Sequence, residues 1–397
     1  MGLSTSAAVE RPSAAAPGRR GEGLRIALFS GNYNCVRDGA NKALNRLVAF
    51  LLDEGAKVRV YSPTVPQSAF PPVGELVSVP SVGIPRRREY RLALGLTRRV
   101  KEDIVGFRPT HFHLSAPDLL GRSAQRFARR LGIPVIASFH TRFETYLGYY
   151  GLQFLVPAAE RNLKSFYAGS DWVLAPNDAM AEWLRADGRC DRVRIWSRGV
   201  DRELFTPERR DLEWRRARGY RDGDMVVMFF GRLVVEKGLE TFAAAVEMLR
   251  AQGHSLRPLV VGDGPARAWL EERLPDALFT GHLEGDELGR AVASADILIN
   301  PSATEAFGNV NLEAMAAGLA VVSADVGSAQ SLIEPFRTGV LVPPSDPSAY
   351  ARAVDALIRS PERRRGLGLA AAAAACAYNW PDILESVLSV YSSSGLF

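Results

Sequence analysis

Short apolar runs alternate with helix-length segments along most of the chain. Each half of the sequence holds six such runs, and each run has the length of a strand. Short apolar strands separated by helices are typical of parallel sheets built from βαβ units. The pattern therefore predicts two doubly wound α/β domains in series. The predicted strands are 24–30, 57–63, 110–114, 133–139, 172–176 and 192–196, then 225–231, 258–262, 277–281, 296–300, 319–324 and 338–343.

Breaks in this pattern mark the predicted domain boundaries. Residues 1–22 are rich in Ala, Ser, Pro and Gly, which predicts a disordered arm. The polar stretch 201–222 is expected to link a first domain at 23–200 to a second domain at 223–375. Ligands of such sheets bind beyond the carboxyl ends of the strands, so the natural active site is the cleft between the domains.

The composition agrees with a folded protein of two domains. The chain has 397 residues, of which 47% are apolar. Its apolar runs are much shorter than the roughly 20 residues that a membrane-spanning helix needs. The cysteines, Cys35, Cys190 and Cys376, lie far apart in the sequence. This spacing argues against a disulfide framework or a structural zinc site, and it fits a reducing, cytoplasmic compartment.

Charge is divided unevenly between the two halves. Residues 1–200 contain 29 Lys and Arg against 17 Asp and Glu, whereas residues 201–397 contain 20 against 27. A basic half indicates a negatively charged partner, such as nucleic acid or an anionic membrane surface. A genome that favours arginine codons is the alternative, because the chain has only five lysines.

Two carboxylates frame the start of a predicted helix in the segment PSATEAFGNVNLEAMAAG (301–318). Glu305 lies in the loop after a buried strand, and Glu313 lies about one turn inside the helix. The first backbone N–H groups of a helix have no helical partner, so they attract anionic or oxygen-rich ligands. Gly308 lets a ligand approach the backbone closely. The N–H groups concerned belong to Phe307, Gly308 and Asn309.

Two cations precede the first helix of the second domain, in the segment FFGRLVVEKGLE (229–240). Arg232 follows the predicted strand, and Lys237 comes five residues later. Two positive charges at a strand end suit a diphosphate, because they neutralise the charge that develops on a departing phosphate.

Two segments of the first domain are also candidates. The loop SGNYNCVRDGANKALNRLV (30–48) contains Gly39 before a helix, where a phosphate or sugar can lie. It has neither GxGxxG nor GxxxxGK[ST], which argues against a nicotinamide dehydrogenase and a P-loop NTPase. The segment IASFHTRFETYLGYYG (136–151) places His140 at the end of a buried strand. Its aromatic residues beside arginines suit an amphipathic acceptor or a membrane interface.

One pair of aspartates has a spacing typical of metal sites, but we expect it to form a turn. Asp222 and Asp224 have the DxD spacing of a Mg²⁺–nucleotide site, but they precede a predicted strand, at the end opposite to the active site. The sequence also lacks a His/Cys/Asp cluster at metal spacing and a GxSxG elbow. We therefore expect neither a metal ion nor a cofactor.

Together these segments resemble the retaining glycosyltransferases of family 4 (group 1), which have the GT-B fold of two Rossmann-like domains facing across a cleft. The resemblance covers about residues 24–390. The final segment, 376–397, looks like the family's terminal helix, which crosses back onto the first domain. The matching motifs are EAFGNVNLE, GRLVVEKG, VVGDGP (260–265), RGVDRELFTP (198–207), the glycine loop and SFHT.

The resemblance implies a role for each matching residue around the nucleotide. Arg232 and Lys237 would hold the diphosphate, as a metal ion does in DxD enzymes, and Glu313 would hold the ribose. Gly39 would face the phosphate, although many relatives have two adjacent glycines where this chain has Gly followed by Ala. Side-chain shape in the stretch 262–265, which begins with Gly262, and in the stretch 304–309 would select the donor.

The resemblance also implies how the donor sugar is held. Glu305 would bind the sugar hydroxyls, and His140 would contact the sugar from the first domain. The backbone that completes this sugar site is that of Phe307, Gly308 and Asn309.

The stretch SFHTRFETYLGYYG looks like the bacterial branch that glycosylates lipids, with mannosyl-, glucosyl-, glucuronosyl- and sulfoquinovosyl-lipid synthases. This likeness implies transfer of a hexose from a UDP- or GDP-sugar to a hydroxyl of a membrane lipid, such as diacylglycerol or ceramide. We then expect a cytoplasmic protein bound peripherally to the inner face of an anionic membrane, with no nucleic-acid partner. The basic residues that agree with this are Arg86, Arg87, Arg88, Arg98, Arg99 and Lys101.

Three alternatives share the expected fold. A glycosyltransferase that acts on a saccharide or a small molecule would use the same donor site. A sugar-nucleotide epimerase would convert the donor without any acceptor. A non-catalytic binder of nucleotide sugars would show no turnover, and the presence of Glu305, Lys237 and His140 argues against it.

Overall fold

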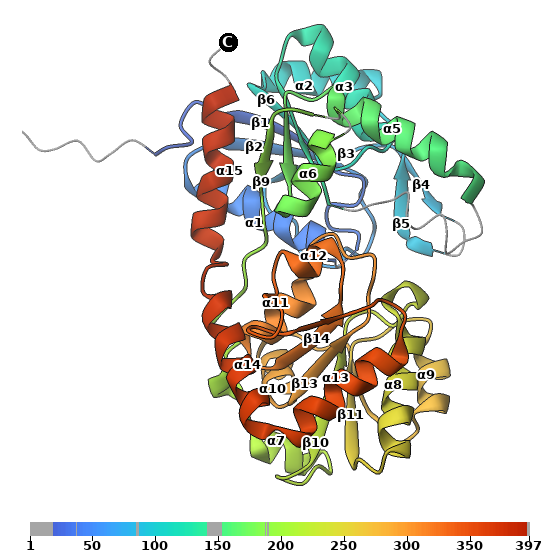
Figure 1. The fold of residues 1–397 in the computed structure, drawn as a ribbon. Coiled ribbons are helices and arrows are strands. Elements are labelled where there is room, and N and C mark those ends of the chain that lie inside the picture. Colours follow the sequence, from blue (N-terminus) through green and yellow to red (C-terminus); the bar gives the residue numbers. More distant parts are fainter. Residues whose placement is uncertain are drawn as a thin grey trace, which may run out of the picture.

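The computed structural model confirms two parallel-sheet α/β domains, which lie one above the other in Figure 1. Most of the predicted arm lies outside the described residues. Its last residues lie against the end of the first helix, where the Gly21 N–H donates to the Glu54 carbonyl at 2.9 Å. The structure describes residues 19–36, 38–84, 87–140, 153–186, 188 and 190–394, with the backbone alone at 84 and 87–89.

The first domain is built on a seven-stranded sheet in which all neighbouring strands are parallel. The strand order is β3-β2-β1-β6-β7-β8-β9, so the chain leaves β1 on one side and later returns on the other. Ligands of open parallel sheets bind at such a switch point. The strands are β1 (Arg25–Phe29), β2 (Lys57–Ser62), β3 (Glu75–Ser78), β6 (His111–Leu114), β7 (Val135–Ser138), β8 (Trp172–Ala175) and β9 (Val193–Ile195).

Helices cover both faces of this sheet, because alternate strand residues point to opposite sides. Ala27 and Phe29 pack with α2, α3, α5 and α6, whereas Ile26 and Leu28 pack with α1 and α15. The helices are α1 (Gly39–Asp53), α2 (Arg98–Phe107), α3 (Leu119–Leu131), α5 (Val156–Ala168), α6 (Asp178–Ala186) and α15 (Trp380–Ser394), with a short 3₁₀ turn η1 (Gln153–Leu155).

Three strands that the apolar pattern did not predict lie between residues 75 and 93. The first, β3, closes one edge of the sheet, and β4 (Ser81–Ile84) pairs with β5 (Arg87–Ala93) as an antiparallel hairpin. β3 and β4 have only four residues each, β3 is no more than half-buried, and β5 is rich in arginine, so no continuous apolar run marks these strands.

The second domain has a six-stranded parallel sheet of order β12-β11-β10-β13-β14-β15, with its switch point between β10 and β13. Its strands are β10 (Met225–Phe230), β11 (Leu256–Val261), β12 (Leu278–Gly281), β13 (Ile297–Asn300), β14 (Ala320–Ala324) and β15 (Val340–Val342). Its helices are η2 (Pro207–Arg209), α7 (Leu212–Ala217), η3 (Val235–Lys237), α8 (Leu239–Ala251), α9 (Arg267–Arg273), α10 (Gly285–Ala293), α11 (Asn309–Ala316), α12 (Gly327–Gln330), α13 (Pro347–Arg359) and α14 (Pro361–Ala375).

The polar stretch 201–222 packs onto the second domain. Trp214 and Tyr220 are buried in one cluster with Val226 of β10. Arg215 is fully buried, and its guanidinium donates to the Asp224 carbonyl and lies 3.5 Å from an Asp296 carboxylate oxygen. Such internally paired charges explain why this stretch resembles a solvated linker in sequence.

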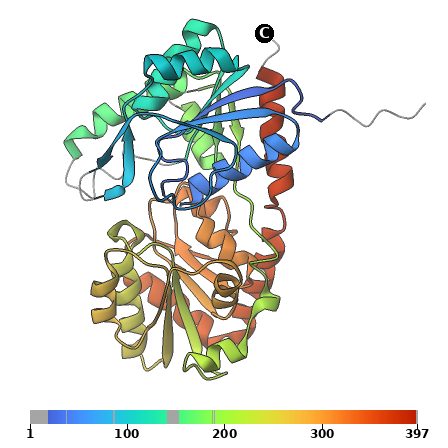
Figure 2. The same ribbon diagram turned by 180° about the vertical axis from the view of Figure 1, so that it is seen from behind.

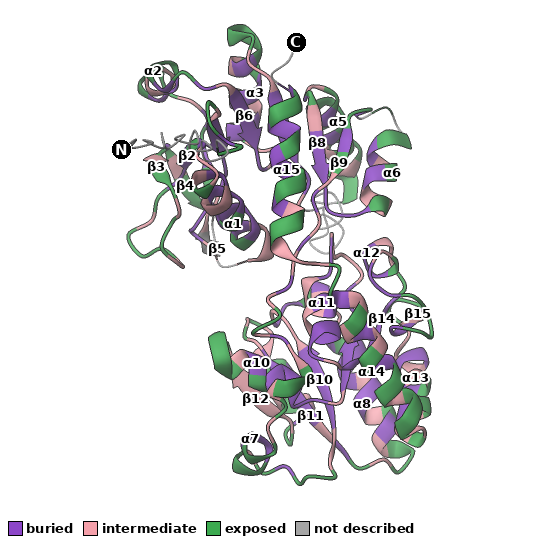
Figure 3. Cartoon of the chain, turned by 90° about the vertical axis from the view of Figure 1, so that its left-hand side faces the viewer, coloured by how far each residue is buried: buried purple, intermediate pink, exposed green. Residues whose placement is uncertain are grey.

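The chain crosses between the domains twice, along neighbouring paths. The Val200 N–H donates to the Tyr378 carbonyl at 2.9 Å, which ties the two crossings together. After the second crossing, α15 returns to the first domain and buries one stripe of side chains, among them Val387 and Tyr391, beside α1 (Figures 1 and 3). This confirms the predicted returning helix. Among the described helices, none has both the length and the apolar character needed to cross a membrane.

Candidate active site

The loops after β10 and β13 bring an ion pair to the switch point of the second domain. Lys237 ends the turn η3 after β10, and Glu305 lies in the loop after β13. The Lys237 Nζ lies 2.5 Å from Glu305 Oε1, with 17% and 21% of the two side chains exposed. Burial raises the pKa of Glu305, but the charge and hydrogen bond of Lys237 outweigh it and hold that pKa below its usual value. Glu305 is therefore a carboxylate at neutral pH.

Arg232 extends from the same switch point toward the first domain. Its Nη1 donates to the Tyr90 hydroxyl of β5 at 3.2 Å. The guanidinium is half-buried and lies in the field of Glu236 and Asp38. The charge of Arg232 is thus placed where the two domains meet.

The N-termini of two helices meet beside these cations. A β-carbon on Gly39, at the start of α1, would lie 2.2 Å from Asn309 Nδ2, at the start of α11. Gly308 precedes α11 with a φ of 91°, a left-handed conformation that favours glycine. Within the described residues, the N–H groups of Phe307, Gly308 and Asn309 form no hydrogen bond. Two helix dipoles and free N–H groups make this point favourable for an anion.

Glu313 lies one turn further along α11, close to the first domain. It is half-buried, and burial raises its pKa to about 7, although the charge of Lys42 on α1 acts in the opposite direction. Its carboxylate therefore gains a proton close to neutral pH. An ionised carboxylate accepts hydrogen bonds from a pair of hydroxyl groups. The protonation state of Glu313 will therefore control how tightly a ligand with such hydroxyl groups binds to it.

A buried polar network holds the 301–308 loop and α11 in place. The Asn300 Nδ2 donates to Asn311 Oδ1 at 2.8 Å, and the Asn311 Nδ2 donates to Ser323 Oγ at 2.9 Å. From the first domain, the Asn177 Nδ2 donates to the Ala306 carbonyl at 2.8 Å. The sequence analysis missed these residues. An asparagine at the end of an apolar strand, such as Asn300, is the signal that marks one of them.

His140 lies just after β7, in the first domain. Its Nδ1 accepts a hydrogen bond from Arg198 Nη2 at 2.8 Å, and the Trp196 ring contacts it edge-on at 5.4 Å between centroids. Burial, with a smaller effect of the Arg198 charge, lowers the pKa of His140 well below its ordinary value. His140 is therefore neutral at physiological pH.

Asp38 lies in the electric field of two arginines, Arg198, which bonds to the histidine, and Arg232 of the second domain. Its carboxylate caps α1 by accepting the Asn41 N–H at 2.8 Å. Burial raises the pKa of Asp38, while Arg232 and Arg198 both lower it. The carboxylate therefore lies in the field of both arginines. Asp38 and Arg198 both stand in segments singled out from the sequence, but neither was predicted as a site residue.

The structure gives Phe307 and Gly262, two of the predicted site residues, a structural role as well, and it places Asp222 away from the site as expected. The Phe307 side chain is 5% exposed and contacts the Tyr378 ring, so only its backbone faces a ligand. A β-carbon on Gly262 would lie 1.9 Å from the Gly231 carbonyl, so close packing of two loops already requires glycine there. Asp222 pairs with Arg216 before β10, at the amino end of the sheet. The aromatic segment 141–152 lies outside the described residues.

Comparisons with known proteins agree with this architecture. A profile described as Glycosyltransferase Family 4 matches residues 37–204, and one described as Glycosyl transferases group 1 matches residues 224–360. The chain is 32% identical to a GDP-mannose-dependent alpha-mannosyltransferase of Mycobacterium tuberculosis over 375 residues, which cover 94% of this chain and 97% of that protein. It is 30% identical to the sulfoquinovosyl transferase SQD2 of Arabidopsis thaliana, over 90% of this chain and 71% of that protein.

Solved structures share the same arrangement of domains. Sucrose-phosphate synthase from Thermosynechococcus elongatus matches with a TM-score of 0.73 and 23% identity, over 93% of this chain and 98% of that one. HepE of Anabaena, solved in complex with UDP, matches with a TM-score of 0.72 and 18% identity, over 93% of this chain and 100% of that one. At these identities the likeness shows the GT-B fold alone. The family profiles and the relatives over most of its length show that the chain belongs to the group 1, or family 4, retaining glycosyltransferases.

Proposed function

We propose that this glycosyltransferase moves a hexose from a UDP- or GDP-sugar to a hydroxyl of a membrane lipid, without a metal ion. The observation that carries the donor part is the meeting of two helix N-termini with Arg232 and Lys237. A nucleoside diphosphate carries the negative charge that this point favours. The names of the relatives support the choice of donors, since one acts with GDP-mannose and HepE binds UDP.

The proposed chemistry needs charge stabilisation more than an enzymic nucleophile. The bond between the anomeric carbon and the phosphate oxygen breaks, and a bond from that carbon to the acceptor oxygen forms on the same face. The acceptor proton goes to the departing phosphate. Arg232 and Lys237 would stabilise the diphosphate as its charge grows, in the role that a metal ion plays elsewhere. Glu305 and the N–H groups at the start of α11 would hold the sugar, and Glu313 would hold the ribose.

The lipid part of the proposal rests on the surface of the first domain. The β4–β5 hairpin and the first turn of α5 lie along the same edge of that domain in both Figures 1 and 2. We call the exposed apolar side chains on this hairpin and on the turn η1, which leads directly into α5, the apolar edge. Such a grouping suits an acceptor with acyl chains. The residues of the apolar edge are Val82, Leu92, Phe154 and Leu155.

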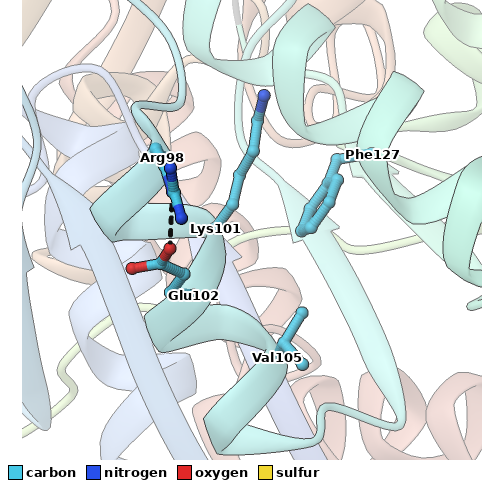
Figure 4. A pocket seen from close by; sticks show the side chains of 5 residues that line it. All are labelled: Arg98, Lys101, Glu102, Val105 and Phe127. Atoms are coloured by element: carbon cyan, nitrogen blue, oxygen red, sulfur yellow. Dashed lines mark hydrogen bonds and ion pairs between the residues drawn. The ribbon is translucent and has the colours of Figure 1, made fainter.

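A groove elsewhere on the surface of the same domain adds positive charge. It lies between α2 and α3, with Arg98 and Lys101 above the apolar Val105 and Phe127 (Figure 4). Arg98 is paired with Glu102 at 2.8 Å, and the Lys101 Nζ lies 5.9 Å from the centre of the Phe127 ring. Basic residues near an anionic lipid surface contribute about 1 kcal/mol each. Arg86 and the side chains of Arg87 and Arg88 lie outside the described part of the chain.

A transfer assay in EDTA tests this function. Labelled UDP-glucose, UDP-glucuronate, UDP-galactose and GDP-mannose are supplied separately, each with diacylglycerol, ceramide and total lipid. We expect label from one donor to enter the organic phase. If label stays in the aqueous phase for every donor, while the protein binds UDP or GDP, the acceptor is a saccharide or small molecule. Conversion of the donor with no acceptor present would instead identify an epimerase.

A further inference from the structure

Arg198 lies where the chain first crosses between the domains, and it is almost fully buried there. Its Nη1 donates to the Trp196 and Ser197 carbonyls at 3.0 and 3.2 Å, which fixes the guanidinium against its own backbone. Its Nη2 is then directed at His140 Nδ1, at 2.8 Å. The guanidinium also stacks on the Trp196 ring, 5.0 Å from the centroid. Arg198 is therefore held rigidly on one side of the histidine.

This hydrogen bond determines where the histidine carries its proton. An arginine only donates, so His140 Nδ1 must accept, and the neutral ring carries its hydrogen on Nε2. The Nε2 atom is buried and has no hydrogen-bond partner among the described residues. A buried N–H group without an acceptor costs free energy, which is recovered when an oxygen of a ligand accepts it.

One side of the His140 ring packs against an aromatic residue of the first domain, Trp196. Trp196 contacts both His140 and His113 edge-on. His113 is itself fixed, with its Nε2 2.6 Å from Ser138 Oγ and its Nδ1 bonded to the Tyr391 hydroxyl of α15. In the described part of the chain, the charged or titratable groups that act on the His140 ring are Arg198 and His113, and Asp38 acts on the charge of Arg198. Arg198 alone among them donates to His140 within the described residues.

We propose that Arg198 is a positioning residue for hexose transfer, which holds His140 as the Nε2–H tautomer so that this N–H can donate to an oxygen of the donor sugar. The tautomer follows from the geometry of the chain itself. The claim that a sugar oxygen accepts the hydrogen bond from this N–H rests on the proposed function. The two parts are therefore tested separately.

The first experiment measures the tautomer without any substrate. The protein with ¹⁵N-labelled histidine is observed by NMR, and the His140 signals are identified among the five histidines by their loss in His140→Asn. We expect a neutral ring with hydrogen on Nε2 that stays neutral down to pH 5. In Arg198→Met, the Nδ1–H form should appear and the ring should titrate at higher pH. An Nδ1–H ring in the unaltered protein, or identical spectra in Arg198→Met, would overturn the proposal, whatever reaction the enzyme catalyses.

The second experiment measures the consequence for turnover. Arg198→Met should lower kcat about ten- to hundredfold, with a donor KM changed less than threefold, because a misplaced group costs mainly rate. The same change in a His140→Ala background should have no further effect, and Arg198→Lys should restore part of the rate. The matched control is Arg194→Met, which removes an exposed arginine of β9 that stacks on Trp172 of the neighbouring strand β8. An equal loss with and without His140, or no recovery in Arg198→Lys, would refute the positioning role.

Discussion

The Lys237–Glu305 pair allows the roles of charge in stability and in catalysis to be separated. In Lys237→Met most of the side-chain length is kept, but Glu305 loses the cation that lies 2.5 Å from its carboxylate. Burial then acts on Glu305 against only Ser302 and the charge of Arg232, so its pKa rises. Removing one partner of a fully buried pair costs about 3–5 kcal/mol. About a fifth of each side chain is exposed, so solvent screens the charge and we expect about 1–3 kcal/mol.

The expected effect on catalysis is larger and has another origin. If Lys237 stabilises the departing diphosphate, its loss removes a preorganised charge from the transition state, which costs about 10²–10³ in kcat. The double variant Lys237→Met/Glu305→Gln removes both charges. It should recover most of the lost stability, because no unpaired carboxylate remains, but it should not recover kcat.

The assay combines thermal unfolding with steady-state hexose transfer at saturating donor. Arg273→Met serves as control, because it breaks a more exposed ion pair with Glu247 at 2.8 Å in the same domain. This control should lose less than about 1 kcal/mol and keep its turnover. Near-normal kcat in Lys237→Met, or recovery of kcat in the double variant, would refute the assignment of Lys237 to the diphosphate.

Three further predictions follow from the described contacts. Because the pKa of Glu313 is raised to about 7, its ionised fraction increases about tenfold between pH 6 and pH 8, so the donor KM should fall over this range in the unaltered enzyme and stay flat in Glu313→Gln. Gly39→Ala places a methyl group against Asn309 Nδ2, so kcat/KM should fall. The free-energy effects of Gly39→Ala and Asn309→Ala should be non-additive by about 1 kcal/mol. Additive effects would mean that α1 and α11 do not meet in the working enzyme. Phe154→Glu should lower transfer to lipid in vesicles about tenfold, with little effect on a short-chain acceptor in detergent, whereas Phe336→Glu, an equally exposed phenylalanine in the second domain, should change neither rate.

The fold was largely predictable because its strands are short, apolar and buried on both faces. All twelve predicted runs became strands of the two parallel sheets. The hairpin β4–β5 was not predictable in this way, since β4 has only four residues and the arginine-rich β5 carries no apolar run. The packing of α7 against the second domain was also not predictable. An arginine such as Arg215 looks like a surface residue in sequence, but here it is buried and its guanidinium is paired inside the domain.

The candidate site was predictable only as far as local spacing reaches. Arg232 and Lys237 each adjoin a glycine in the loop after β10, and Glu305 lies in the loop after β13; the strand order then brings these two loops to one switch point. Contacts between distant segments leave no local pattern. The Asn177 bond to the 301–308 loop and the Arg198 bond to His140 are of this kind. The family resemblance supplied roles for the local motifs, but it supplied none for these contacts.

The central claim is that the diphosphate of a nucleotide sugar binds between the starts of α1 and α11, beside Arg232. Calorimetric titration in EDTA tests it most directly, with UDP and GDP compared with uridine and guanosine. We predict that one diphosphate binds at least a hundredfold more tightly than its nucleoside, and that Arg232→Met removes most of this difference. Equal binding of diphosphate and nucleoside, or binding that EDTA abolishes, would contradict the account.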